Sequence, residues 1–267
     1  MPMIEPILLT TTRLTTFDGS RILTAASGFL FEREERLYVV TSRHVLFDEP
    51  SEHRPDRIEI ELHADQEDIV NATVLSVLLY KEGRSVWRDA RDKGGTVDVA
   101  VIELDRAALP RVLYTFNPSH LLPELQAVHV GTPLLLIGFP LGFYDTLHHL
   151  PVARQAVVAS SFGLRFQGQG YFLSDARTHR GTSGAPVVMN TKQGQGGTSW
   201  TLLGIHSSSV DMLSRDKAQD DSLGLNCVWY ADILMVLTTP EAPIDQDDVP
   251  KIQGPLPLPA ASKALRH

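Results

Sequence analysis

Short apolar runs interrupted by turn residues recur along most of this chain. Between about residues 8 and 238, runs rich in Val, Ile, Leu, Thr and Tyr are broken by Gly, Pro, Asp and Ser, and no long helical pattern separates them. Within Ile58–Leu62, apolar and acidic residues alternate with the period of a half-buried strand. Many short strands at this spacing indicate an all-β, antiparallel sandwich or barrel. The clearest runs are Leu37–Thr41, Ile58–Leu62, Val97–Leu104, Leu134–Ile137, Thr201–Ile205 and Asn226–Tyr230.

Two segments lack this strand pattern. Residues 81–95 are charged and contain glycine, so we expect a loop there. From Pro240 onward the chain is rich in proline and acidic residues, which bury little apolar surface and cannot sustain regular strand pairing. We therefore expect residues 240–267 to form an extended or disordered tail.

The net charge and the single cysteine narrow the classes of function. The 267 residues carry 24 basic and 32 acidic side chains, a net charge of −8, which disfavours binding to nucleic-acid phosphates. No apolar stretch approaches the length of a membrane span, and the N-terminus lacks the basic and apolar regions of a secretory signal. Cys227 is the only cysteine, so no intrachain disulfide forms. We expect a cytoplasmic protein without nucleic-acid or membrane partners.

The segment Arg180–Val188 carries the strongest chemical motif. It reads Arg-Gly-Thr-Ser-Gly-Ala-Pro-Val-Val, and a serine between glycines ahead of an apolar run fits a nucleophile on a tight turn. Gly181 and Gly184 let the backbone approach a substrate, so the N–H groups of Gly181 and Ser183 are candidates for an oxyanion hole. An ordinary glycine-rich turn has the same composition, so this motif alone does not establish catalysis.

Two other motifs carry a histidine and an aspartate. His44 follows the apolar run Leu37–Thr41, and Asp98 lies at the start of Val97–Leu104 among apolar residues. A lone histidine at the end of a strand is more often structural than catalytic. A buried aspartate is costly unless it has a partner, although a turn cap would also satisfy it.

Together the three motifs indicate more than each does alone. His44, Asp98 and Ser183 occur in this order, 54 and 85 residues apart. This arrangement resembles the chymotrypsin/trypsin-like serine protease family, in the bacterial type that lacks the usual disulfides. The resemblance covers about residues 20–235. Three further strings are similar to that family: Ala26–Leu30 ahead of the histidine, Gly131–Gly142 at the opening of the second barrel, and Gly204–Ser208 along the substrate cleft.

The resemblance implies two antiparallel six-stranded β-barrels with the active site in the cleft between them. Residues 1–120 would form the N-terminal barrel with His44 and Asp98, and residues 121–239 the C-terminal barrel with Ser183. In such enzymes the serine attacks the carbonyl, the histidine takes and returns its proton, and the aspartate holds the imidazole. The resemblance implies neither a cofactor nor a metal.

Two residues of the expected oxyanion loop depart from the family pattern. Thr182 stands where Asp or Asn is common, and Arg180 is also unconventional. Neither residue belongs to the expected triad, but both leave the resting shape of this loop open.

The positions that would recognise the substrate resemble those of glutamyl endopeptidases. Arg177 occupies the position that lies at the base of the substrate pocket in trypsin-like enzymes. A cation at this position would disfavour cleavage after Lys or Arg. Thr178 and His206 are similar to hydroxyl and imidazole donors of the glutamyl enzymes, Ser209 matches a third donor position, and Ser207 lies between them. The resemblance implies cleavage after Glu or Gln. The alternative is that His206 is a core residue and Thr178 fills a loop.

Other functions fit less well. An α/β-hydrolase would need Gly-x-Ser-x-Gly, whereas the last position here is Ala185, and its acid and histidine would follow the serine. His148 and His149 are adjacent and would point to opposite faces of a strand, so they do not predict a metal site. The serious alternative to a protease is a catalytically inactive protein of the same fold that serves as a binding module or scaffold.

Overall fold

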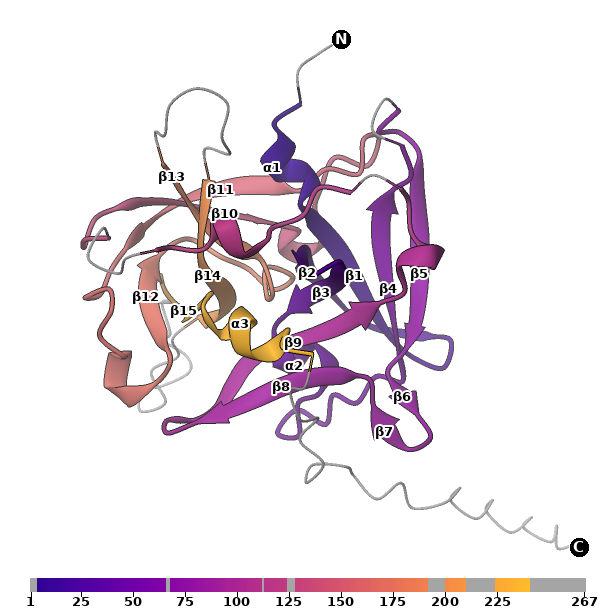
Figure 1. Ribbon diagram of the computed structural model, residues 1–267, viewed down its shortest axis with the longest axis horizontal. Helices are drawn as coiled ribbons and strands as arrows, with labels where there is room; N and C mark the ends of the chain where they lie inside the picture. Colours follow the sequence, from indigo (N-terminus) through magenta and orange to yellow (C-terminus); the bar gives the residue numbers. More distant parts are fainter. Residues whose placement is uncertain are drawn as a thin grey trace, which may run out of the picture.

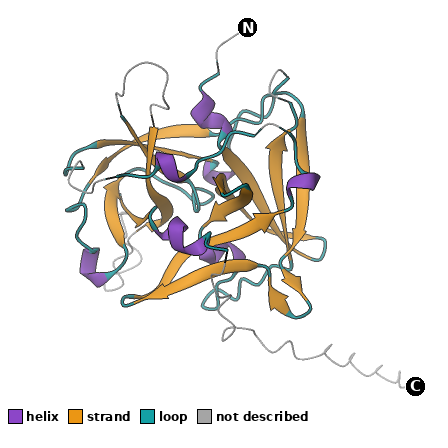
Figure 2. Cartoon of the chain, viewed as in Figure 1, coloured by secondary structure: helices purple, strands orange, loops and turns teal. Residues whose placement is uncertain are grey.

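The computed structural model describes residues 4–65, 68–111, 113–123, 128–191, 200–209 and 224–240. The prediction of a β-rich fold is confirmed, because strands prevail in both halves and the helices are short (Figure 2). The expectation of an extended or disordered tail concerns residues 241–267, which lie outside the described residues, and Pro240 before them. None of the helices in the described ranges has the length and apolar character that crossing a bilayer requires.

The N-terminal half forms one seven-stranded sheet (Figure 1). Every neighbouring pair in it is antiparallel. The strand order places β5 and β8 at the two ends, so the closed barrel of six strands that the resemblance implied is not shown for this half. In order across the sheet, the strands are β5 (Ala72–Leu78), β4 (Arg57–His63), β1 (Thr11–Asp18), β2 (Arg21–Arg33), β3 (Arg36–Thr41), β9 (Gly95–Leu104) and β8 (Trp87–Asp92).

The C-terminal half is a closed barrel of six strands, as expected. All of its pairings are antiparallel. Around the barrel, the strands are β10 (Pro133–Gly138), β11 (Val152–Val158), β12 (Tyr171–Asp175), β15 (Leu225–Tyr230), β14 (Trp200–Ser209) and β13 (Pro186–Asn190).

The expectation of a loop over residues 81–95 is wrong. That segment holds most of a small hairpin, β6 (Tyr80–Lys81) with β7 (Arg84–Ser85), and the edge strand β8. The polar β8 carries no strand period of its own. Backbone pairing with β9 forms it, and this information lies outside the segment.

Strand β4 shows how the sequence sets the buried face. Ile58, Ile60 and Leu62 are buried, while the residues between them are only partly covered. Their period of two matches the predicted half-buried strand. The same alternation points Glu59 and Glu61 to the other face, where each forms an ion pair.

A large apolar cluster joins the two halves of the molecule. Phe29 and Phe116 meet edge to face with ring centroids 5.4 Å apart, and residues of the barrel pack against the same cluster. Each half also has its own apolar core. The barrel contributes Ile137, Val188, Leu202, Ile205 and Trp229 to the shared cluster.

A short C-terminal helix strengthens this joint. Helix α3 (Ile233–Leu237) leaves the barrel and lies against β8 of the other half (Figure 1). Leu234 and Leu237 are buried in the shared cluster. The guanidinium of Arg33 donates to the carbonyl of Met235 at 2.7 Å, and that of Arg88 donates to the carbonyl of Thr239 at 2.8 Å.

Candidate active site

Strand pairing brings His44 and Asp98 together. Thr41, at the end of β3, pairs with Ala100 of β9, and the chain then turns into the one-turn helix α2 (Arg43–Leu46). Asp98 lies two residues before Ala100 on β9 and therefore faces the start of that helix. It accepts two hydrogen bonds from His44, from the backbone N–H at 2.8 Å to Oδ1 and from Nδ1 at 2.7 Å to Oδ2. With Nδ1 held as the donor, Nε2 is the nitrogen free to take a proton.

The barrel supplies a third donor to the same carboxylate. The hydroxyl of Ser207, on β14, donates to Oδ2 of Asp98. Burial raises the pKa of Asp98, but the hydrogen bonds and charge of His44, with the Ser207 bond, outweigh it and hold this pKa below its ordinary value. Asp98 is therefore a carboxylate at neutral pH.

The same environment makes His44 a stronger base than an ordinary histidine. Burial lowers its pKa, but the hydrogen bond to Asp98 and the charges of Asp98 and Asp48 together raise it above 6.5. A general base of this kind accepts a proton readily near neutral pH.

Ser183 lies on the turn between β12 and β13, beside the same groove as His44. Its hydroxyl donates to the carbonyl of Ser207 at 3.0 Å. Within the described part of the chain, no hydrogen bond joins Ser183 Oγ to the His44 imidazole. The structure thus joins two of the three predicted catalytic side chains directly and places the third beside them. Rotation about χ1 of Ser183 is the movement that would redirect its oxygen.

The backbone around Ser183 has the geometry expected of glycine-dependent loops. Gly181 and Gly184 have φ values of +90° and +84°. A Cβ on Gly181 would lie 2.5 Å from the carbonyl oxygen of Phe139, and one on Gly184 would lie 2.2 Å from that of Ser27. Neither the N–H of Gly181 nor that of Ser183 donates to another described residue. Both amides are therefore available to a ligand, as an oxyanion hole requires.

The groove beside these residues is open and about 830 Å³ in volume. His44, Gly181 and Ser183 line it together with residues of both halves. This volume is large enough for several residues of an extended peptide. Its charged lining residues are Asp18, Arg21, Asp48, Glu52, Arg54 and Arg180.

The expected substrate-binding residues differ in their exposure and in their hydrogen-bond partners. Arg177 is exposed on the loop after β12. The hydroxyl of Thr178 donates to Oδ1 of Asn226 at 2.5 Å. Ser207 contacts Asp98, as described above. Ser209 ends β14 opposite Asn226, and its side chain lies outside the described atoms.

His206 is buried and neutral at physiological pH. Burial, aided by the charge of His44 and opposed by that of Asp98, lowers its pKa to about 3. Its Nδ1 is buried without a hydrogen-bond partner among the described residues.

Sequence reasoning missed two residues that organise this region. Asn226 sits in the predicted strand Asn226–Tyr230, yet its amide donates to the carbonyls of Ala176 and Gly224 and so shapes the loop that carries Thr178. Ser27 contacts the loop around Ser183 from β2. The hydrogen-bond partners of Asn226 and Ser27 are distant in the sequence and come close only in the folded chain. The one available signal was that Ser27 lies within Ala26–Leu30, a string that resembles the protease family.

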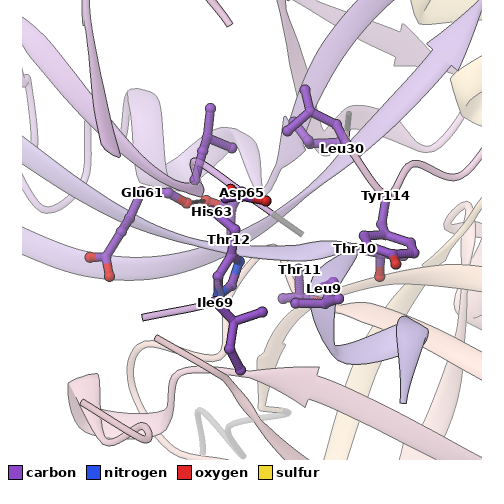
Figure 3. A pocket seen from close by; sticks show the side chains of 12 residues that line it. Leu9, Thr10, Thr11, Thr12, Leu30, Glu61, His63, Asp65, Ile69 and Tyr114 are labelled. Atoms are coloured by element: carbon purple, nitrogen blue, oxygen red, sulfur yellow. Dashed lines mark hydrogen bonds between the residues drawn. The ribbon is translucent and has the colours of Figure 1, made fainter. Parts of the chain in front are cut away.

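A second, smaller cavity lies beside β1 and β4 (Figure 3). Its lining includes Thr10, Leu30 and Tyr114, and its volume of about 20 Å³ has room for about one water molecule. It is too small for a peptide side chain.

Comparison with known proteins agrees with this geometry. The profile of the trypsin-like peptidase domain matches residues 26–195. A serine endoprotease from Yersinia pestis superposes with a TM-score of 0.53 at 16% identity, over 85% of this chain and 61% of its own. The HtrA-type protease AlgW, with a tripeptide, gives 0.52 at 16% identity, over 85% and 58%. The chain thus spans about three fifths of the length of these two structures, and no curated protein sequence matches it.

Proposed function

The chain belongs to the trypsin-like peptidase family, and we propose that it is a serine endopeptidase that acts through His44, Asp98 and Ser183. The observation that carries the proposal is the double hydrogen bond between Asp98 and His44 at the groove that Ser183 lines. The amides of Gly181 and Ser183, which donate to no other described residue, support it further.

In the proposed reaction, the hydroxyl of Ser183 turns toward His44 and attacks the carbonyl carbon of a peptide bond. Nε2 of His44 takes the hydroxyl proton, and Asp98 stabilises the imidazolium that forms. The oxyanion accepts hydrogen bonds from the N–H groups of Gly181 and Ser183. His44 then gives its proton to the leaving amine, and water, activated in the same way, hydrolyses the acyl-enzyme.

The resting position of Ser183 fits a substrate-induced first step. When its hydroxyl leaves the carbonyl of Ser207, that carbonyl loses a donor. A backbone N–H of an extended peptide lying along β14 can replace it. The bound peptide would then favour the rotamer in which Ser183 faces His44.

We assign the triad to two domains, residues 1–120 with His44 and Asp98 and residues 121–239 with Ser183. A preference for Glu or Gln before the scissile bond is the finer part of the proposal, and Thr178, His206, Ser207 and Ser209 would provide it. His206 is neutral and its buried Nδ1 has no hydrogen-bond partner among the described residues, which supports a role for this imidazole as an N–H donor to a bound side chain. Exposed Arg177 would disfavour Lys and Arg side chains.

Covalent labelling tests the catalytic proposal. A fluorophosphonate should modify the wild type at Ser183, and Ser183→Ala should abolish the label while Ser161→Ala, at an exposed serine, keeps it. His44→Ala should lower turnover of a good peptide substrate by about 10⁴-fold with unchanged circular dichroism. A folded wild type that takes no label and cleaves no peptide library would contradict the proposal and favour the inactive scaffold.

The same peptide library tests the preference. Cleavage after Glu or Gln is expected, and His206→Ala should reduce this preference more than it reduces labelling by the fluorophosphonate. Cleavage mainly after Lys, Arg or large apolar residues would overturn the preference while leaving the protease assignment intact.

A further inference from the structure

The side chain of Ser27 lies at the junction of three segments that meet beneath the nucleophile. It is fully buried on β2. Its Oγ donates to the carbonyl of Gly181 at 2.7 Å and accepts from the N–H of Phe139 at 3.0 Å. Ser27 therefore connects the N-terminal sheet both to the loop before Ser183 and to the segment that follows β10.

The backbone of Ser27 adds two further bonds. Its N–H donates to the carbonyl of Ser183 at 3.0 Å, and its carbonyl accepts from the hydroxyl of Thr41 at 2.9 Å. Every polar group of this residue thus has a partner, and two of the partners belong to the Gly181–Gly184 loop.

With the bonds from Ser27, each carbonyl from Arg180 to Ser183 accepts a hydrogen bond. The carbonyl of Arg180 accepts from the N–H of Leu141 at 2.6 Å, and that of Thr182 accepts from Ala185 at 3.0 Å. With Gly181 and Ser183 held by Ser27, all four consecutive carbonyls are paired. In a trans peptide the N–H points opposite to the carbonyl of the preceding residue, so the Arg180 carbonyl orients the N–H of Gly181 and the Thr182 carbonyl orients that of Ser183.

Resting on the proposed function, we infer that Ser27 is a positioning residue for the oxyanion hole. Its hydroxyl holds the Gly181 carbonyl, which belongs to the peptide between the two peptides that carry the N–H groups of Gly181 and Ser183. It also anchors Phe139, two residues before the Leu141 whose N–H holds the Arg180 carbonyl. Without the hydroxyl, the Gly181 carbonyl and the Phe139 N–H are both left unpaired in a buried place. The loop then relieves this cost by reorienting its peptides.

The close packing around Ser27 leaves little room for another polar group to replace the two hydrogen bonds of its hydroxyl. A Cβ on Gly138 would lie 2.7 Å from Ser27 Oγ, and one on Gly184 would lie 2.2 Å from the Ser27 carbonyl oxygen. The backbones therefore close tightly around the hydroxyl. Removing that single oxygen leaves the Gly181 carbonyl and the Phe139 N–H facing a methyl group that can pair with neither.

Kinetics of Ser27→Ala test the inference, with Thr238→Val as the matched control. Thr238 is equally buried, and its hydroxyl donates to the carbonyl of Leu234 in α3, so its loss costs stability without contacting the loop. We expect Ser27→Ala to lower kcat about 10- to 100-fold with KM within about threefold, and Thr238→Val to change neither by more than twofold. A kcat within twofold of wild type, or an equal fall in both variants, would overturn the inference.

Hydrogen exchange gives a readout that does not need activity. In Ser27→Ala, peptides covering residues 137–142 and 179–185 should exchange faster, whereas β4 should be unchanged. If the fluorophosphonate fails to label the wild type, the protease proposal is lost, yet exchange still decides whether Ser27 orders this loop. Unchanged exchange in both segments would overturn the inference.

Ser27→Cys covers the case in which the alanine variant does not fold. The thiol is larger than the hydroxyl but keeps a donor at the same place on the side chain, and it donates more weakly. Its kcat and its exchange in residues 179–185 should fall between those of the wild type and of a fully released loop. Wild-type values of both would contradict the proposed role.

Discussion

Ser207 donates its hydroxyl to the carboxylate of Asp98, so a strand of the barrel supports an acid that belongs to the opposite sheet. Asp98 would otherwise depend on His44 alone for its hydrogen bonds. The bond couples the relative position of the two halves to the charge of the His44–Asp98 pair. It also explains why Ser207 is needed on β14 even if it never touches a substrate.

The first prediction follows from this bond. Ser207→Ala should lower kcat/KM about tenfold and destabilise the fold by about 2 kcal/mol, because a buried carboxylate loses one of its three donors. Peptide hydrolysis and urea unfolding measure the two effects. Ser208→Ala, at the neighbouring exposed position, should change neither. Equal effects in the two variants would show that the Asp98 bond is unimportant.

The second prediction concerns the pH dependence of turnover. His44 must be neutral to accept the proton of Ser183, and Asp98 and Asp48 raise its pKa above 6.5 against the effect of burial. Activity should therefore be lost as the pH falls through a value above 6.5. The groups that face His44 are Asp98, Asp48 and the neutral His206.

Profiles of kcat/KM against pH in the wild type and in Asp98→Asn measure this effect. The substitution removes the charge that raises the pKa, so the acid limb of the variant should move to lower pH, in addition to a rate loss of about 10⁴-fold. A wild-type limb at or below 6.5 would contradict the assigned environment of His44.

The third prediction uses His206 as a probe of stability. Its pKa is about 3 when folded and 6.5 when unfolded, so between these values the unfolded chain binds a proton that the folded chain does not. Stability should consequently rise with pH, by up to about 1.4 kcal/mol per pH unit, and this contribution should level off above 6.5.

Urea unfolding between pH 4.5 and 6.5 tests the slope. His206→Asn should be less stable than wild type overall but should show a flatter dependence on pH in this window. His129→Asn, at an exposed position, should keep the wild-type slope. Parallel slopes for wild type and His206→Asn would argue against a buried neutral imidazole.

The fourth prediction concerns a clamp on the loop that borders the groove. Glu61 of β4 accepts hydrogen bonds from the guanidinium of Arg13 and from Nδ1 of His149. His149 lies in the segment between Leu141, which lines the groove, and β11. Glu61→Ala should destabilise the fold by about 2 kcal/mol, because it leaves Arg13 without its partner in a partly buried place.

The same substitution should lower kcat/KM a few-fold and make residues 143–150 easier to cleave with an added protease. Glu59→Ala is the matched control, since Glu59 lies on the same face of β4 and pairs with Arg57 away from this loop. Equal sensitivity to proteolysis in the two variants would exclude a clamp specific to Glu61.

Short sequence patterns predicted those features of the fold that are determined by neighbouring residues. The alternation in Ile58–Leu62 gave a correct strand, because one face of β4 is buried and the other is not. His44, Asp98 and Ser183 were predicted as a catalytic triad because their neighbouring residues form recognisable motifs, and the register of β3 with β9 brings the first two together.

Features that depend on distant partners could not be predicted in this way. The polar strand β8 exists because β9 offers it a backbone to pair with. The hydroxyl of Ser27 reaches a carbonyl 154 residues further along the chain, and no short motif contains that relationship. A closed N-terminal barrel is likewise not shown, since closure depends on how the end strands β5 and β8 meet and not on the pattern within either.

The fifth prediction concerns where the folded body ends. Helix α3 buries Leu234 and Leu237, and the last tertiary bond of the described chain joins Arg88 to the carbonyl of Thr239. Truncation after Thr239 keeps these contacts and should leave Tm within a few degrees of the full chain. Truncation after Asp232 removes two buried leucines, each worth about 2 kcal/mol, and the bonds that Arg33 and Arg88 make. This loss of several kcal/mol in the free energy of unfolding should lower Tm by roughly 10 °C or more. Thermal unfolding of the three chains separates the cases: a large loss on truncation after Thr239 would mean that the proline-rich tail stabilises the body.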